Sequence, residues 1–227
     1  MSLEFNPIEE KNRLEDITAQ LLEKAKRAGA NGCEVVTSAS VGLDAQARMG
    51  EPEKLEMTRD QSVSVTVFVN DSRGTSTTTD FSPDALNKAV EAALAIAKVT
   101  APDPASMLAP ADQIINEVPD LDLDHPWNIG TQDALALAIE VETAGRESDH
   151  RITNSEGSSV STSRSLSVHG TTEGLMVSQT SSMHGISCVL LAESGGSRER
   201  SYAYTQARDA SQLTSAEVLG RQAAERT

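Results

Sequence analysis

The chain contains four histidines, the residue type that most often binds metals or carries protons in active sites: His125, His150, His169 and His184. A zinc peptidase typically places two histidines one helical turn apart with a glutamate beside the first, because one helix face then presents all three groups. None of the four is followed by glutamate, and no two are close enough in sequence to share a helical turn. We therefore expect structural or surface roles for them, with His169 and His184 beside glycines at strand edges.

Hydroxyl side chains are abundant between residues 153 and 182, but no G-x-S-x-G segment that would form a nucleophile elbow is present. A nucleophilic serine needs a positioned base and oxyanion donors. Alternation along a strand explains the enrichment better, so we expect these residues to line an exposed sheet face. The sequence also has no G-x-G-x-x-G segment and no phosphate-binding loop.

Three carboxylates alternate at Asp120, Asp122 and Asp124. If this segment is extended, all three lie on one side and could bind a hard cation such as calcium. No glycine-containing loop or terminal glutamate completes a calcium motif, so we expect a solvated acidic face instead.

Cys33 and Cys188 are the only cysteines, and neither belongs to a C-x-x-C pair. Each lies in or beside an apolar, strand-like run, where a free cysteine behaves as a small buried hydrophobe. A disulfide between them stays open as an alternative, and the sequence does not show whether they approach each other. The charged N-terminal segment lacks the apolar region of a secretory signal, so we expect a reducing, cytoplasmic location.

A short charged run, Arg198, Glu199 and Arg200, precedes Tyr202 and Tyr204 on an expected strand. Both rings would share one face of that strand, and tyrosine and arginine are favoured at protein interfaces. The segment is therefore a candidate for contact with a partner or peptide, although an ordinary exposed strand is the favoured interpretation.

The net charge is 19 − 34 = −15, which disfavours direct contact with nucleic acid or with anionic membranes. Such a charge is also typical of a highly soluble protein. No stretch approaches the roughly 18 apolar residues that a membrane span requires. With six aromatic residues in 227, the core must consist mainly of Ala, Val, Leu and Ile.

Apolar periodicity predicts four helices: residues 9–28, a helix opened by Ser82-Pro83-Asp84, residues 131–147, and a last helix after the capping box Thr214-x-x-Glu217. Alternation predicts short strands before the connector at 33–38, 41–47, 55–57, 61–70 and 74–79. After His150 it predicts strands at 151–154, 158–169, 174–182, 184–193 and 199–207. The turns are expected at residues 70–74, at Glu156-Gly157, Gly170 and Glu173-Gly174, and at Gly195-Gly196.

These elements predict an α+β fold in which antiparallel β-meanders are flanked by helices and the order helix–strands–helix occurs twice. Five of the eight prolines fall in residues 101–128, which also lack Lys and Arg. We therefore expect an N-terminal α+β unit at 1–100, a Pro- and acid-rich connector at 101–128, and a second α+β unit at 129–227. The apolar residues of the connector suggest that it packs along a surface.

Four segments, taken in order, resemble the N-terminal half of the PmbA/TldE members of the TldD/PmbA metallopeptidase family, whose members have also been described as modulators of DNA gyrase. These segments are DFSPDALNKAVEAALAIAKVTAPDP at 80–104, PDLDLDHP at 119–126, RITNSEG at 151–157 and SYAYT at 201–205. The matches span nearly the whole chain. The resemblance also implies that the second unit continues into a C-terminal domain absent here.

The resemblance implies a role in proteolysis and peptide maturation as one subunit of a heterodimer. In this family TldD holds zinc through an H-E-x-x-x-H helix and a distant cysteine, and the PmbA/TldE paralogue lacks those ligands. This chain has no H-E-x-x-x-H segment, and Cys188 does not match the zinc cysteine. We therefore expect no catalytic residue, metal ligand or cofactor here, and zinc only in a TldD-like partner. The expected partners are that paralogue and an extended peptide, with no direct nucleic acid and no membrane; the substrate-binding residues are unknown.

Two other functions stay open. The chain could be a peptide- or protein-binding module, of the type that modulates DNA gyrase, without any peptidase role. The chain could also act directly on DNA, but the net charge of −15 argues against this function.

Overall fold

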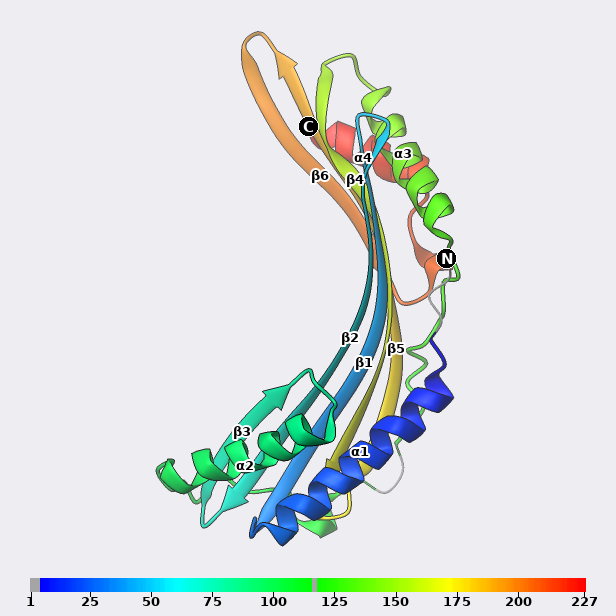
Figure 1. The fold of residues 1–227 in the computed structure, drawn as a ribbon. Coiled ribbons are helices and arrows are strands. Elements are labelled where there is room, and N and C mark those ends of the chain that lie inside the picture. Colours follow the sequence, from blue (N-terminus) through cyan, green and yellow to red (C-terminus); the bar gives the residue numbers. More distant parts are fainter. Residues whose placement is uncertain (1–4, 116–117) are drawn as a thin grey trace.

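One six-stranded antiparallel sheet forms the centre of the molecule in the computed structural model, which describes residues 5–115 and 118–227. Its strands are β1 (Gly32–Arg48), β2 (Glu51–Val69), β3 (Ser72–Thr78), β4 (Ile152–Thr171), β5 (Met176–Ser194) and β6 (Ser197–Ala207). They lie in the order β3-β2-β1-β4-β5-β6, so β1 and β4 pair at the middle of the sheet. The sheet bends strongly along its strands (Figure 1).

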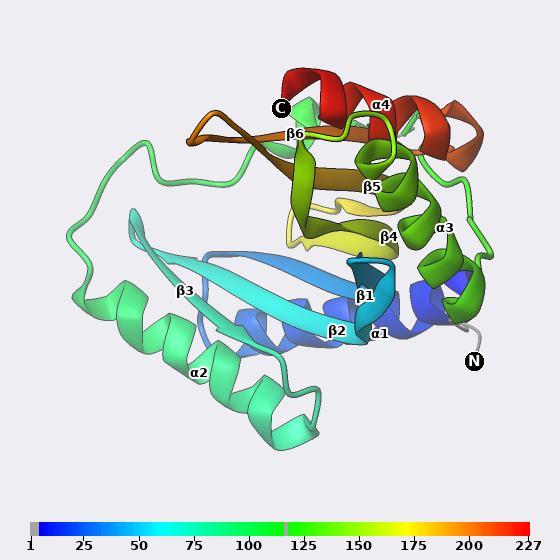
Figure 2. The same ribbon diagram turned by 90° about the horizontal axis from the view of Figure 1, so that it is seen from above.

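Four α-helices cover one face of this sheet: α1 (Pro7–Arg27), α2 (Pro83–Val99), α3 (Thr131–Arg146) and α4 (Ala216–Arg226) (Figures 1 and 2). Two short 3-10 turns, η1 (Ala111–Gln113) and η2 (Ala210–Gln212), precede α3 and α4. The predicted α+β class and the repeated order of helix, strands and helix are confirmed. No α-helix in the described part of the chain has the length and apolar character needed to span a bilayer.

The two halves of the chain contribute to one sheet, since β1 pairs with β4 from Glu34 to Ala47. Helices α1 and α3 each contact both of these strands. The division into 1–100, 101–128 and 129–227 stays a prediction. Strand β1 of the first expected unit and strand β4 of the second are hydrogen-bonded neighbours.

Several predicted strand breaks are wrong. The runs 33–38 and 41–47 belong to the single strand β1, and 55–57 and 61–70 fall within β2. In the same way, 151–154 and 158–169 merge into β4, and 174–182 and 184–193 merge into β5. Small residues such as Ala39 and Ser40 weaken the apolar alternation without breaking it, because each remains paired with neighbours on both sides.

Two expected turns lie inside β4 instead. Gly157 has a φ of +104° and sits where the register between β4 and β5 shifts. A glycine in this conformation can form a β-bulge as well as a turn, and the sequence alone does not separate the two. Gly170 is also a strand residue, and a Cβ there would lie 2.5 Å from a methyl group of Thr18 on α1. The turns at Glu173-Gly174 and Gly195-Gly196 are confirmed, whereas the turn expected at 70–74 is confined to Asn70 and Asp71, because β3 begins at Ser72.

Helix starts were predicted with mixed success. The Ser82 hydroxyl accepts from the Ala85 amide at the start of α2, as expected, and Pro83 is the first helical residue. The capping box at Thr214 is wrong, because α4 begins after Ser215, whose side chain makes no capping hydrogen bond. The Thr214 amide donates instead to Thr205 Oγ1 on β6, which ties the loop before α4 to that strand.

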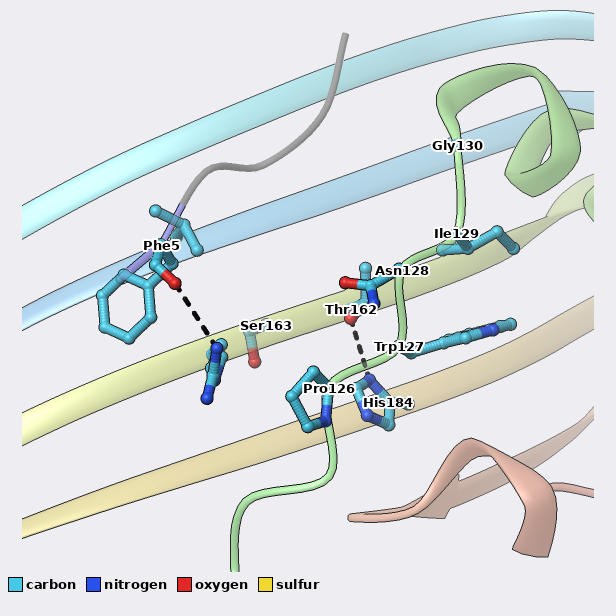
Figure 3. Close-up of a pocket in the computed structure, with 11 residues that line it drawn as sticks. Phe5, Pro126, Trp127, Asn128, Ile129, Gly130, Thr162, Ser163 and His184 are labelled. Carbon is cyan, nitrogen blue, oxygen red and sulfur yellow. Dashed lines mark hydrogen bonds between the residues drawn. The ribbon is translucent and has the colours of Figure 1, made fainter. Parts of the chain in front are cut away.

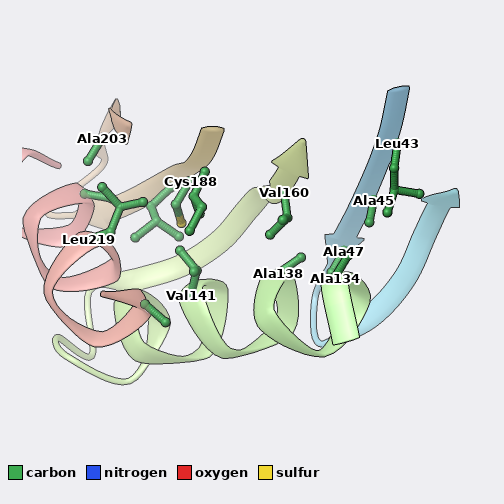
Figure 4. Close-up of a cluster of buried hydrophobic side chains, with 14 of the residues drawn as sticks. Leu43, Ala45, Ala47, Ala134, Ala138, Val141, Val160, Cys188, Ala203 and Leu219 are labelled. Carbon is green, nitrogen blue, oxygen red and sulfur yellow. The ribbon is translucent and has the colours of Figure 1, made fainter. Parts of the chain in front are cut away.

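Two large apolar clusters lie between the helices and the sheet, and a smaller third one consists of Leu14, Ala39, Leu166 and Val168. The α1–α2 cluster includes Val35, Val65 and Val90, and the α3–α4 cluster includes Val141, Leu190 and Leu219 (Figure 4). Both consist mainly of aliphatic residues, as the composition predicted. Burial of these apolar surfaces contributes roughly 25 cal/mol per Å² and fixes each helix on the sheet.

The opposite face of the sheet is open and rich in serine. Alternate residues of β4 from Ser159 to Ser167 lie on it, which confirms the prediction that hydroxyl residues line an exposed face. Many of these hydroxyls bond across strands, as Ser38 does with Ser62 (2.8 Å) and Ser159 with Ser187 (2.9 Å). In each such pair one hydroxyl is the hydrogen-bond partner of the other, so these groups need no ligand to complete their hydrogen bonds.

Candidate functional site

A row of polar side chains crosses the helix-facing side of the sheet between the two large apolar clusters. We call it the polar belt and define it as Thr162 and Arg164 on β4 with Ser182 and His184 on β5. Thr162 is paired with His184, and Arg164 with Ser182, in the β4–β5 register. Buried polar groups in such a position are costly unless they are hydrogen-bonded.

His184 is almost fully buried, at 1% exposure, and both of its ring nitrogens are occupied. Figure 3 shows one of these two contacts, the hydrogen bond with Thr162. Nε2 lies 2.8 Å from the His125 carbonyl oxygen, and Nδ1 lies 2.8 Å from Thr162 Oγ1. A carbonyl only accepts, so Nε2 carries the proton and Nδ1 accepts from the threonine hydroxyl. The expected position at a strand edge is wrong, because His184 lies near the middle of β5 (Met176–Ser194). The expected structural role agrees with these contacts.

The other belt residues hold the connector against the sheet. Arg164 forms a bidentate ion pair with Asp124, and its guanidinium lies over the Phe5 ring at 5.5 Å. Ser182 accepts from the His125 amide at 2.8 Å, and its own amide donates to the Leu123 carbonyl at 2.8 Å. The expectation that the connector packs along a surface is therefore confirmed for residues 123–125.

A cavity of about 300 Å³ adjoins the belt, between the connector and the sheet (Figure 3). Trp127 forms part of its wall and meets the His184 ring edge-to-face, with centroids 5.5 Å apart. The other lining residues are Phe5, Val41, Pro126, Asn128, Ile129, Gly130, Thr162, Ser163 and Arg164. Because His184 and Arg164 are already engaged, the cavity offers no free acid–base pair. The polar groups beside the cavity serve to hold the connector on the sheet.

The remaining histidines do not gather. His125 Nε2 lies 3.0 Å from the Asp122 carbonyl, and His150 is exposed just beyond α3, beside Asp149. His169 Nε2 lies 2.8 Å from a Glu34 carboxylate oxygen across the β1–β4 pair. This contact does not meet the geometry of a hydrogen bond, and it is an ion pair only when His169 is protonated.

The three alternating aspartates do not share one side. Asp122 has a φ of +50°, and the Asp120 side chain accepts from the Asp122 amide at 2.9 Å, so the segment turns. Asp124 is committed to Arg164. The extended geometry on which the calcium alternative depended is therefore absent.

Cys33 and Cys188 are free, buried thiols in different apolar clusters. Burial raises the pKa of each to about 12, with a smaller contribution from Glu34 near Cys33 and from Glu142 near Cys188. Both behave as small hydrophobes, as predicted, and the disulfide alternative is wrong.

The donor groups present do not fit zinc. Among residues 5–115 and 118–227, no three His, Cys, Asp or Glu side chains lie together in a way that could hold a metal ion. His184 has no free nitrogen, and both thiols remain protonated over the neutral range. We derive no chemistry through a metal on this chain.

Tyr202 and Tyr204 lie on β6, one edge of the sheet, with 53% and 63% of their surfaces exposed. Their rings stack with centroids 6.3 Å apart, so the prediction that they share one face is confirmed. Arg200 in the preceding run is held by Glu156 on β4 at 2.7–2.8 Å, which lowers the pKa of that carboxyl. The tyrosine pair is available for contact, and the arginine is engaged within the chain.

Sequence reasoning missed Glu142 on α3. Its carboxylate is fully buried and accepts from the amides of Met49 and Gly50 in the β1–β2 turn, both at 2.8 Å. The only sequence signal was its position beside Val141 on the buried stripe of a predicted helix, where an acid is unexpected.

Two models of one family match this chain. The PmbA/TldA metallopeptidase domain 1 matches residues 33–97, and the PmbA/TldA metallopeptidase central domain matches residues 124–227. The chain is 36% identical over 214 residues to the metalloprotease PmbA of Escherichia coli O157:H7, covering 94% of this chain and 47% of that protein. It is 36% identical over 205 residues to the PmbA homolog of Haemophilus influenzae, with 90% and 45% coverage. The chain thus spans about half the length of these relatives.

Solved structures share the fold. A candidate modulator of DNA gyrase from Bacteroides thetaiotaomicron superimposes with a TM-score of 0.85 at 19% identity, covering 93% of this chain and 48% of that one. TldE from Thermococcus kodakarensis superimposes with a TM-score of 0.73 at 15% identity, covering 92% and 46%. These likenesses establish the architecture, and the sequence matches establish the relationship. The chain belongs to the PmbA/TldD metallopeptidase family, of which it carries the first and central domains.

Proposed function

We propose that this chain is the N-terminal part of a PmbA/TldE-like subunit of a TldD/TldE-type metalloprotease that acts in peptide maturation and proteolysis. The observation that carries the proposal is the 36% identity to E. coli PmbA across 94% of the chain. The sequence has no H-E-x-x-x-H segment, so zinc and cleavage are assigned to a TldD-like partner. The two buried, protonated thiols suit a reducing cytoplasm, where we place the complex.

Mixing the chain with its TldD-like paralogue tests this proposal. We expect a mixed complex by size-exclusion chromatography with light scattering, and cleavage of an unstructured peptide that requires the paralogue. The chain alone should hold no stoichiometric zinc and should leave the peptide intact. Stoichiometric zinc, cleavage by the chain alone, or failure to bind the paralogue at micromolar concentration would each contradict the proposal.

A second candidate is a peptide- or protein-binding module without a peptidase role. The exposed, stacked pair Tyr202 and Tyr204 on the edge strand β6 favours it, because aromatic rings often anchor interfaces. The variant Tyr202→Ala/Tyr204→Ala separates the two. If it loses binding to an unstructured peptide in the absence of the paralogue, the binding module is favoured. Salt-dependent binding of duplex DNA would instead revive direct action on DNA.

A further inference from the structure

Another cavity, of about 310 Å³, lies on the serine-rich face of the sheet, at the end where β1 begins and β2 ends. Its floor includes Phe68 of β2, Glu34 of β1 and His169 of β4. The connector forms the opposite wall with residues 105–109 and Ile114. This volume is at the lower end of the range for small-molecule sites, about 300–1,000 Å³.

Two contacts seat the connector on this end of the sheet. The Asp103 amide donates to the Asp71 carbonyl oxygen, in the turn between β2 and β3, at 2.7 Å. Leu108 lies against Gly32, where a Cβ would be only 3.0 Å from Leu108 Cδ1. Gly32 thus leaves room for the leucine, and the cavity beside it has a defined wall on the connector side.

Two buried polar atoms that line this cavity have no hydrogen-bond partner. They are Ser106 Oγ and His169 Nε2, and within residues 5–115 and 118–227 no other buried side-chain nitrogen or oxygen lacks one. A buried polar atom without a partner is costly, so folded proteins rarely leave one. Because both atoms belong to one cavity, they indicate a place for a polar ligand.

The cavity also contains groups of both charges. Arg73 of β3 lines it and makes no hydrogen bond or ion pair with the described residues. Glu34 Oε1 lies 2.8 Å from His169 Nε2 without hydrogen-bond geometry. When the histidine is neutral and protonated on Nδ1, both of these atoms are acceptors. One ammonium group of a ligand has three N–H donors and could serve both.

The spacing of the charged groups suits a small zwitterion. Strand β2 lies between β1 and β3, so the backbones that carry Glu34 and Arg73 are two strand spacings apart, roughly 10 Å. Both side chains line the cavity, and each is long enough to shorten that gap. The cavity is also lined by Phe68, Leu108 and Ile114, which offer apolar surface to the rest of a ligand.

We propose that this cavity binds a free α-amino acid with an apolar side chain. Its ammonium group contacts Glu34 and His169, its carboxylate contacts Arg73, and its side chain packs on the apolar wall. The Ser106 hydroxyl gains a hydrogen-bond partner on the same ligand. This site goes beyond the proposed function and does not depend on it, because the chain alone carries every group involved.

Analogues that each lack one group of the ligand test the proposal. We expect L-leucine to bind the unaltered chain with a Kd on the order of 0.1–1 mM in a ligand-detected NMR titration. Three analogues should each bind about tenfold more weakly or worse: 3-methylbutylamine without the carboxylate, 4-methylpentanoate without the ammonium group, and glycine without the apolar side chain. The proposal is overturned if leucine shows no binding up to about 10 mM, or if any analogue binds as well as leucine.

Two variants assign the charged ends of the ligand. Arg73→Gln should raise the Kd for leucine about tenfold and should not weaken binding of 3-methylbutylamine, which has no carboxylate. Glu34→Gln should raise the Kd for leucine by a similar factor and should not weaken binding of 4-methylpentanoate, which has no ammonium group. A loss of structure in the site would instead weaken all ligands together.

Arg198→Gln is the matched control for the arginine variant. Arg198 is 78% exposed in its side chain and lies beside the β5–β6 turn, at the opposite end of the sheet from Glu34. Its replacement should leave the Kd for leucine unchanged, and circular dichroism verifies that each variant is folded. If Arg73→Gln weakens leucine and 3-methylbutylamine equally, the arginine has only a structural role and the proposal is overturned.

Discussion

At the scale of single residues, polar groups in this protein join elements together. The Glu142 carboxylate fastens the β1–β2 turn to α3, and His184 fastens the connector to β5. In each case a side chain meets backbone groups that lie far away in the sequence. These contacts explain why residue types that often perform chemistry serve structure here.

Replacing Glu142 tests this role directly. Glu142→Ala removes two charge-assisted hydrogen bonds and leaves a cavity under α3, so we expect a loss of about 2–4 kcal/mol in the free energy of unfolding. Urea denaturation followed by circular dichroism measures the change. Glu140→Gln, an exposed position on the same helix, should change stability by less than about 0.5 kcal/mol. Equal effects of the two variants would contradict the assignment.

The buried thiols yield a second prediction. With their pKa raised to about 12 from an ordinary value near 9, Cys33 and Cys188 carry about a thousandfold less thiolate at pH 8 than exposed cysteines. We expect negligible alkylation by iodoacetamide in the folded chain and two modified cysteines after denaturation, counted by mass spectrometry. Rapid labelling of the folded chain would disprove their burial.

The raised pKa of the two thiols also makes the stability of the fold depend on pH. The folded state holds these two protons more tightly than the unfolded state does, so this contribution is complete below pH 9 and declines as the pH rises from 9 towards 12. Unfolding measured over that range should show stability falling with pH. Replacement of both cysteines by alanine should reduce the slope.

At the scale of elements, helices α3 and α4 meet at two glycines. A Cβ on Gly220 would lie 2.3 Å from the Val141 carbonyl oxygen and 2.7 Å from the Gly145 amide nitrogen. Backbone therefore packs against backbone at this crossing. Alanine is more favourable than glycine in a helix by about 1 kcal/mol. For Gly220→Ala, helix propensity therefore predicts a more stable protein, whereas packing predicts a less stable one.

We expect packing to prevail for Gly220→Ala. Because the atoms in the way belong to backbone, the helices must separate, and the free energy of unfolding should fall by about 1–3 kcal/mol. Thermal denaturation measures this change. Val218→Ala, at a position that is 46% exposed on the same helix, should have little effect. A more stable Gly220→Ala variant would show that the crossing has room to adapt.

At the scale of the whole molecule, the central β1–β4 pair makes one sheet from two similar halves. Each half has the order helix, three strands, helix, and the sheet order is symmetric about β1 and β4. The apolar clusters remain separate, with the polar belt between them. The α3–α4 cluster also contains Leu43, Ala45 and Ala47 of β1, so cooperativity between the halves rests on shared apolar packing as well as on backbone pairing.

We expect this pairing to make unfolding a single transition. Trp127, the only tryptophan, reports on the polar belt by fluorescence, and circular dichroism reports on all strands and helices. The two urea transitions should coincide, as two-state unfolding requires. A tryptophan transition well separated from the circular dichroism transition would show that the two predicted units unfold independently.

The sequence alone predicted the four helices, the alternating faces of the strands, the burial of both cysteines and the α+β class. It could do so because these properties follow from local periodicity and side-chain chemistry, which are present in any short window of the chain. It also predicted the family, because the motifs at 80–104 and 151–157 are short runs of residues that can be recognised in the sequence itself.

Only the tertiary structure decided which strands are continuous, where Gly157 bulges, and that Glu142, His184 and Arg164 hold distant elements. The physical reason is that each of these depends on partners that lie outside any short window of the sequence. The pairing of β1 with β4 belongs to the same class, because the neighbours of a strand are set only when the whole sheet is assembled. Local pattern shows which side of a strand is apolar, and the assembled sheet decides what lies beside it.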